Sequence, residues 1–129
     1  MHRMKSVLLL VVAAGGAACS SPPPADEFAA AWKKGEQNEH DGAAGTAYVH
    51  QMVRSLGPAL TASTQACGGS PAQSTQHVQL AMQLNIDGSV RKAMVAPSSA
   101  YWDCVRDALA KKQFPAPPTD GFWTSGTIG

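Results

Sequence analysis

Apolar and polar residues alternate along one stretch of this chain, from residue 78 to residue 86. The apolar positions are Val78, Leu80, Met82, Leu84 and Ile86. This period of two predicts a β-strand that buries one face and exposes the other to water. Asp87-Gly88 follows and has the composition of a tight hairpin turn, with a positive φ expected at Gly88. Residues 89–96 are therefore predicted to return as the second strand of a hairpin.

Upstream of the hairpin, apolar residues recur at the spacing of a helix. Asp41 is the predicted N-cap, and the helix is expected to end at CGGSP, which places Cys67 at its C-terminal end. Gly57-Pro58 is predicted to kink or restart it, because proline has no N–H to donate. The residues at helical spacing are Tyr48, Val49, Met52, Val53, Leu56 and Leu60.

A second helix is predicted after the hairpin, with Ser98 or Ser99 as its cap. Its apolar stripe consists of Trp102, Val105 and Leu109. After QFPAPP, the last residues, GFWTSGTIG, can form one short strand. The order α-β-β-α-β predicts an α+β domain over residues 42–129. In it, a small antiparallel sheet, made of the hairpin and the C-terminal strand, has two helices packed on one face.

The N-terminus has the pattern of an export signal. MHRMKS is basic, and the segment VLLLVVAAGGAA that follows ends at Cys19. A transmembrane helix needs about 20 apolar residues, so this shorter segment favours a signal peptide over residues 1–18. Gly16-Ala17-Ala18-Cys19 resembles a bacterial lipobox, which implies that Cys19 carries lipid. Cleavage by ordinary signal peptidase after Ala18 and retention as a membrane anchor are the alternatives.

Residues 19–41 are predicted to be a flexible tether that follows the lipidated cysteine. The segment begins with CSSPPPADE, which is polar and rich in proline. Phe28 and Trp32 lie four residues apart and indicate a short helix around residues 26–34. Such a pair more often packs on the domain than binds a partner.

The cysteine count fits lipidation, because three cysteines in an exported chain leave one unpaired. If Cys19 carries lipid, Cys67 and Cys104 remain to form a disulfide in an oxidising compartment. That bond would join the end of the first helix to the second helix. Two buried free thiols are the alternative.

Charge and motifs exclude several classes of function. The net charge is +1, and without Arg3 and Lys5 there are eight Lys and Arg against nine Asp and Glu, which does not favour nucleic-acid binding. Motifs of serine hydrolases, P-loop NTPases and zinc proteases are absent. His40, His50 and His77 lack the spacing of metal ligands. We predict no catalytic residue, metal or cofactor, and a protein that is not an enzyme.

From about residue 76 to residue 129 the chain resembles the C-terminal domain of TonB, in particular the AgmX/PglI-type branch. The matching segments are NIDGSV, VAPSS, DCVRDAL and KQFPAP. The resemblance implies a module that binds partner segments by adding a strand to an exposed sheet edge. Energy coupling itself is not expected, because it needs an uncleaved anchor and a long proline-rich spacer.

We therefore predict an exported, lipid-anchored envelope protein that faces the periplasm or the cell surface. It would act as an accessory part of an envelope assembly or of a transport or motility system. A secreted ligand-binding or inhibitor domain stabilised by its disulfide is the alternative function.

The predicted partner-binding edge is the final strand, through Phe122, Trp123, Thr124 and Ser125. Because side chains alternate along a strand, only Phe122 or Trp123 can pack on helices that cover one face. The other is a candidate anchor for a partner, unless both residues close the core.

Overall fold

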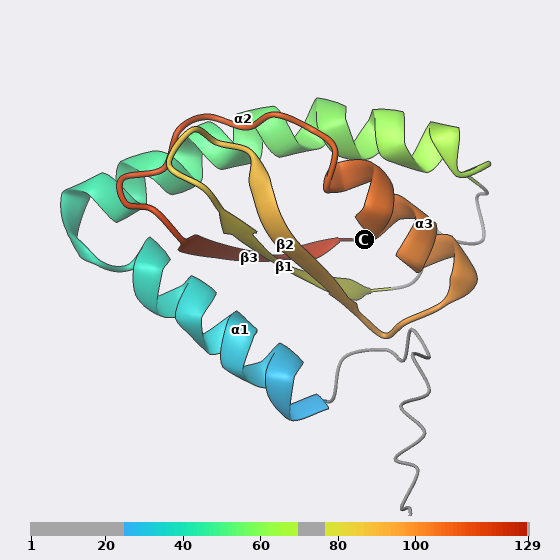
Figure 1. Ribbon diagram of the computed structural model, residues 1–129, viewed down its shortest axis with the longest axis horizontal. Helices are drawn as coiled ribbons and strands as arrows, with labels where there is room; N and C mark the ends of the chain where they lie inside the picture. The colour runs from blue at the N-terminus through green and yellow to red at the C-terminus, as the bar shows by residue number, and fades with distance from the viewer. Residues whose placement is uncertain (1–24, 70–76, 129) are drawn as a thin grey trace, which may run out of the picture.

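The computed structural model describes residues 25–69 and 77–128. The helices are α1 (Ala25–Glu39), α2 (Gly42–Ala66) and α3 (Ala100–Leu109). The strands are β1 (Val78–Leu84), β2 (Val90–Ala96) and β3 (Phe122–Ile128). All pairing is antiparallel, and β1 lies in the centre of a sheet with the order β2-β1-β3 (Figure 1). The predicted α+β class is confirmed, whereas the predicted signal peptide and Cys19 lie outside the described residues.

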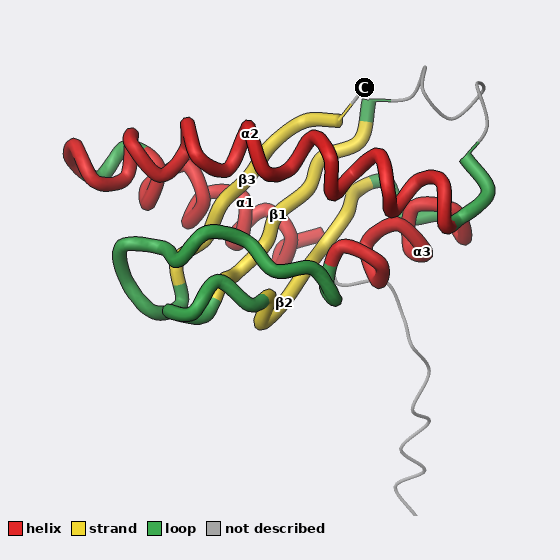
Figure 2. Tube along the Cα trace, turned by 90° about the horizontal axis from the view of Figure 1, so that it is seen from above, coloured by secondary structure: helices red, strands yellow, loops and turns green. Residues whose placement is uncertain are grey.

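The main core lies between one face of the sheet and the helices α2 and α3. Figure 2 shows these two helices lying over the strands. The alternation in β1 builds this core, because every second residue of the strand points toward the helices. Each fully buried side chain of this size contributes about 1.5–3 kcal/mol. The buried residues are Val78, Leu80, Met82 and Leu84 of β1, Tyr48 and Met52 of α2, Trp102, Val105 and Leu109 of α3, and Val95, Phe114 and Phe122.

Tyr48 fixes the segment that leads from α3 to β3. Its hydroxyl donates a hydrogen bond to the carbonyl oxygen of Pro115 at 2.8 Å. Its ring meets that of Phe122 edge to face, with the centroids 5.0 Å apart. Burial raises the pKa of Tyr48 above its usual range, so the phenol stays protonated and keeps this bond.

The helix α1 covers the opposite face of the sheet. Its residues fall in the segment 19–41, which the sequence predicted to be a flexible tether. Phe28 and Ala31 of α1 pack against Ala81, Met94 and Trp123. The expectation of helices on one face therefore holds for α2 and α3 but is incomplete, and the folded unit includes residues 25–41. The physical reason is that the second face is also apolar and must be covered.

The fit between α1 and β3 is close at one glycine. A Cβ atom on Gly35 would lie 2.6 Å from Oγ of Ser125. Because Gly35 has no side chain, the last turns of α1 can approach the strand closely.

The helix α2 runs from Gly42 to Ala66 as one element, with Pro58 inside it. The predicted restart at Gly57-Pro58 is therefore wrong. A side chain before proline clashes with the proline ring in helical conformation, and Gly57 has none, so the helix can continue. The predicted cap, Asp41, precedes the helix but makes no hydrogen bond to it through its side chain.

The hairpin turn is built around Gly88, as predicted. Its φ is 87°, and its N–H donates to the carbonyl oxygen of Asn85 at 2.9 Å. Oδ1 of Asp87 accepts hydrogen bonds from the hydroxyl and the N–H of Ser89, and these bonds lower the pKa of Asp87. Ile86 belongs to the turn and is 53% exposed, so its predicted place on the buried face of the strand is wrong.

The helix α3 is fixed at its start by a cap and by a disulfide. Oγ of Ser99 accepts a hydrogen bond from the N–H of Trp102 at 3.1 Å, which makes Ser99 the N-cap. Cys104 is bonded to Cys67, with 5.9 Å between the two Cα atoms. The predicted disulfide is confirmed, and it joins the end of α2 to α3.

Candidate functional site

The strand β3 forms one edge of the sheet, because it pairs with β1 on one side only. The N–H groups of Trp123 and Ser125 donate to side chains of α1, so they point away from β1. By the alternation of a strand, the main-chain groups of Thr127 point the same way. The outer edge of β3 therefore consists of Trp123, Ser125 and Thr127.

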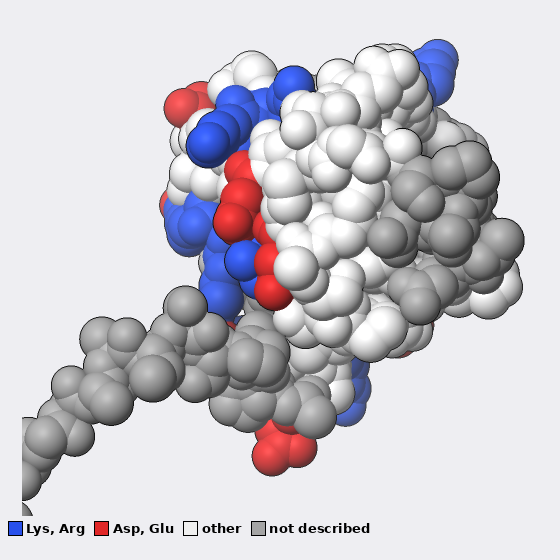
Figure 3. All heavy atoms as spheres, turned by 90° about the vertical axis from the view of Figure 1, so that its right-hand side faces the viewer, with Lys and Arg blue, Asp and Glu red and all other residues white. Residues whose placement is uncertain are grey.

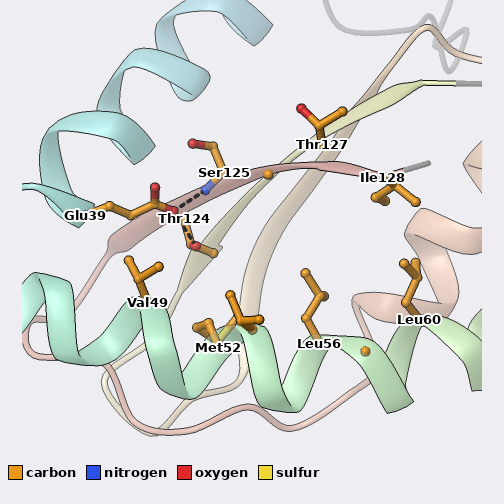
Figure 4. A pocket seen from close by; sticks show the side chains of 12 residues that line it. Glu39, Val49, Met52, Leu56, Leu60, Thr124, Ser125, Thr127 and Ile128 are labelled. Carbon is orange, nitrogen blue, oxygen red and sulfur yellow. Dashed lines mark hydrogen bonds between the residues drawn. The ribbon is translucent and has the colours of Figure 1, made fainter.

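A groove lies between this edge and α2, and we call it the β3 groove. Its volume is about 360 Å³. Figure 4 shows that the α2 side chains point toward β3 and that Glu39, the last residue of α1, lies at one end. The lining residues are Val49, Met52, Val53, Leu56, Gly57 and Leu60 of α2, residues 124–128 of β3, and Glu39.

The two walls of the β3 groove have similar lengths. From Val49 to Leu60, α2 extends about 17 Å at 1.5 Å per residue. Residues 124–128 extend about 13 Å at 3.3 Å per residue. An extended segment of four or five residues matches these dimensions.

The wall formed by α2 is apolar and partly open to solvent. Its side chains recur every three or four residues, which places them on one side of the helix. Val53 is 67% exposed, and only Val53 and Ile86 are large, exposed apolar residues in the part of the chain that the structure describes. Val53 therefore gives the groove an exposed apolar contact.

Two side chains from the end of α1 occupy part of the outer edge. Oδ1 of Asn38 accepts a hydrogen bond from the N–H of Trp123 at 2.8 Å. Oε1 of Glu39 accepts one from the N–H of Ser125 at 2.8 Å and one from the hydroxyl of Thr124 at 2.8 Å. The edge is thus capped at its beginning, and its exposed end is at Thr127.

The four residues predicted to bind a partner are placed in two different environments. Phe122 and Trp123 are 4% and 9% exposed and lie on opposite faces of the sheet. Both rings therefore close the core, as the sequence allowed, and neither is an exposed anchor, because α1 covers the second face. Thr124 and Ser125 do line the β3 groove.

Sequence reasoning missed the contribution of α2 and of the end of α1 to this site. One signal was present, because Val49 and Val53 follow Tyr48 and Met52 and make the apolar stripe of α2 wider than one core needs. For Asn38 and Glu39 the sequence carries no comparable signal.

Charged residues do not form a field of one sign on the surface in Figure 3. Lys and Arg side chains lie interleaved with Asp and Glu side chains in a band, and the described surface beside this band is largely uncharged. Oppositely charged side chains also form ion pairs, as between Arg106 and Asp103 at 3.3 Å and between Lys92 and Glu27. Such mixing does not favour binding of nucleic acid.

Within residues 25–69 and 77–128, no group of three or more His, Cys, Asp and Glu residues is placed to hold a metal ion. Among the helices in these ranges, none combines the length and the apolar character needed to cross a membrane.

Comparison with protein-family models, curated proteins and solved structures finds no match to this chain.

Proposed function

We propose that the protein is an exported, lipid-anchored envelope protein whose domain is a non-catalytic protein-interaction module. The observation that carries this proposal is the β3 groove, in which the edge of a strand runs beside an apolar helix face. An extended segment of another envelope protein binds there by adding a strand to β3.

Two kinds of contact would hold such a segment. Its main chain would form hydrogen bonds with the outward groups of β3, beginning at the exposed Thr127. Every second side chain would point toward α2, over Val53 and Leu56. Backbone pairing gives affinity for many sequences, and the apolar wall selects the side chains.

The order of elements supports a TonB C-terminal-like module. From α2 onward it is α-β-β-α-β, which the resemblance implies, with Cys104 in α3 and Phe114-Pro115 after it. A lipid on Cys19 would hold the domain close to a membrane, because only residues 20–24 separate Cys19 from α1. This placement fits an accessory part of an envelope assembly or of a transport or motility system.

Lipidation of Cys19 is tested by labelling cells that express the protein with radioactive or clickable palmitate. The wild-type protein is expected to carry the label and to sediment with membranes. Cys19→Ala is expected to lose the label, because the thiol that accepts the lipid is gone. A wild-type protein that is exported without label would contradict lipid anchoring.

The binding surface is tested by placing a charge in the β3 groove. Val53→Asp is expected to reduce recovery of crosslinked envelope partners about tenfold, because an apolar contact is replaced by a carboxylate. Ala62→Asp is the matched control, since Ala62 is also exposed on α2 but does not line the groove. Equal recovery with both variants would show that partners do not use this groove.

Strand addition itself is tested with a proline in β3. The main chain of Thr124 pairs with β1 and the N–H of Ser125 is bound by Glu39, so proline at either position would disturb the fold. Thr127 is exposed and its N–H points outward, so Thr127→Pro is expected to spare the fold and to weaken partner capture. Undiminished capture by a folded Thr127→Pro protein would contradict strand addition.

A secreted ligand-binding domain is the second candidate function, and the size of the groove favours it. A volume of about 360 Å³ lies within the range of about 300–1,000 Å³ that small-molecule sites have. A small apolar ligand would be lost with Val53→Asp but not with Thr127→Pro, because it needs no main-chain pairing. The two variants together therefore separate the two functions.

A further inference from the structure

The side chains of Asn38 and Glu39, which we call the caps of β3, bind the main-chain groups that a further strand would pair with. The N–H groups of Trp123 and Ser125 lie two residues apart on the outer edge, and each donates to one side-chain oxygen at 2.8 Å. In an added antiparallel strand, main-chain carbonyl oxygens would accept the same two hydrogen bonds. Asn38 and Glu39 thus occupy the positions that an incoming peptide needs.

We infer that Asn38 and Glu39 are an internal competitor for the edge of β3. The ligand that displaces them is an extended peptide with apolar side chains at every second position and a basic residue at the Glu39 end. This inference rests on the proposed function, because it names the partner and the regulation of the same groove.

Displacement of the caps does not require α1 to leave the sheet. The helix is held by Phe28 and Ala31, which pack on the far face of the sheet, and by the close approach of Gly35 to Ser125. Asn38 and Glu39 contact the edge through their side chains. A change of rotamer is therefore enough to free both N–H groups.

The charge of the groove selects one feature of the peptide. Of the described residues that line it, Glu39 alone is charged, and the others are apolar, small or hydroxyl-bearing. After Glu39 releases the N–H of Ser125, its carboxylate is placed to pair with a Lys or Arg of the peptide. Because Glu39 lies at one end of the groove, the basic residue belongs at one end of the bound segment (Figure 4).

Strand geometry decides which peptide residues do which task. On β3, Ser125 directs its N–H to the outer edge and its side chain toward α1. The main-chain groups of Thr124 point toward β1 instead, and its side chain lies on the other face, beside the groove. An added strand repeats this coupling, since side chains of directly paired residues lie on the same face. The peptide residues that bind β3 are therefore not those whose side chains lie over α2.

The probe is an eight-residue peptide in which valine and threonine alternate between terminal lysines, carried on a polyethylene glycol tail for solubility. A lysine at each end lets either strand direction bring one lysine to Glu39. Methylation of the threonine main-chain nitrogens is expected to abolish binding, whereas methylation of the valine nitrogens is expected to be tolerated. Binding that survives threonine methylation would overturn pairing with β3.

Removal of one cap tests the competition, with binding measured by calorimetry on the full mature protein. Asn38→Ala is expected to bind the peptide about fivefold more tightly than wild type, because one hydrogen bond no longer has to be broken. Gln37→Ala, an exposed neighbour on α1, is the matched control and is expected to bind as wild type. Equal or weaker binding by Asn38→Ala would overturn the inference.

Charge selection is tested separately with Glu39→Gln. This variant is expected to bind the lysine peptide about threefold more weakly, which is the size of an exposed ion pair. A peptide with glutamine in place of both lysines is expected to show no such loss. Equal losses of affinity with both peptides would overturn the inference that a basic residue of the peptide pairs with Glu39.

Amide hydrogen exchange in the free protein gives a readout that does not depend on the peptide. Asn38→Ala is expected to speed exchange at Trp123 and to leave Gly126, which faces β1, unchanged. If the peptide binds neither the wild-type protein nor any variant, the inference is overturned. Loss of partner capture with Val53→Asp and Thr127→Pro, without tighter peptide binding by Asn38→Ala, would refute the competition and leave the proposed function standing.

Discussion

Replacing Cys67 and Cys104 together by alanine is expected to lower the free energy of unfolding by about 4 kcal/mol. The disulfide joins residues 37 positions apart, and this loop contains the whole β-hairpin. Without the bond, the unfolded chain gains the freedom that the closed loop denied it. Domains of this size are stable by only about 5–15 kcal/mol, so the loss is a large share of the total.

The loss is measured by denaturant unfolding of the oxidised wild-type protein and of the double variant. Wild type treated with a reductant is the control, and its midpoint is expected to fall to that of the variant. A difference below about 1 kcal/mol would show that contacts between α2 and α3 hold these helices without the disulfide.

Gly88→Val is expected to destabilise the domain by at least about 3 kcal/mol, through two separate effects. The φ of 87° lies in the left-handed region, which a β-branched residue resists. In addition, a Cβ atom on Gly88 would clash with the carbonyl oxygen of Phe114. The N–H of Phe114 donates to the carbonyl oxygen of Gly88 at 3.0 Å, so the clash falls where the turn is joined to the segment after α3.

Gly42→Val separates these two effects. Gly42 has a φ of 72°, but outside its chain neighbours and its own helix backbone no heavy atom lies within 4 Å of the position of its Cβ. It is expected to lose only about 1–2 kcal/mol, the cost of the backbone conformation. Equal losses in thermal or denaturant unfolding would show that the contact with Phe114 relaxes at no cost. Unchanged stability of Gly88→Val would contradict a turn that needs a positive φ at Gly88.

Much of the fold follows from local patterns in the sequence. The alternation that begins at Val78 predicts β1, and Asp87-Gly88 predicts the turn, because both depend on neighbouring residues. Ile86 continues the alternation and yet lies in the turn, since Asn85 already bonds to Ser89 across it. The pattern shows that a strand is present but not the residue at which it ends.

Phe28 and Trp32 indicated a short helix that packs on the domain, but the sequence did not show that α1 extends to Glu39 and covers a whole face of the sheet. Most of its residues are polar or small, and its few large apolar side chains also fit a short helix in a tether. The face that it covers was equally hidden, because Gln79, Ala81 and Gln83 of β1 have the composition of an exposed face. Only the three-dimensional arrangement brings Met94 of β2 and Trp123 of β3 together beside Ala81 and creates an apolar surface.

The candidate site could be predicted only in part, because it too depends on contacts between distant segments of the chain. The position of β3 at an edge follows from the order of the strands, but the caps do not. Asn38 and Glu39 are separated from Trp123 and Ser125 by more than 80 residues, and such contacts leave no local pattern. The sequence left the environment of Trp123 open for the same reason, because its burial depends on α1.

A capped edge reconciles binding with solubility. An open edge strand pairs readily with other chains and favours aggregation. Asn38 and Glu39 satisfy the first two outward N–H groups of β3, while Thr127 stays exposed. A partner that fits the groove can displace them, whereas a random strand gains too little.

Site-specific photocrosslinking in the native envelope tests the central claim most directly. A photoreactive amino acid at position 53 is expected to give a crosslinked product with an extended segment of one envelope protein. The same amino acid at position 62, outside the groove, is expected to give none, and Thr127→Pro is expected to abolish the product at position 53. Equal products at positions 53 and 62, or a product at 53 that persists with Thr127→Pro, would contradict strand addition at β3.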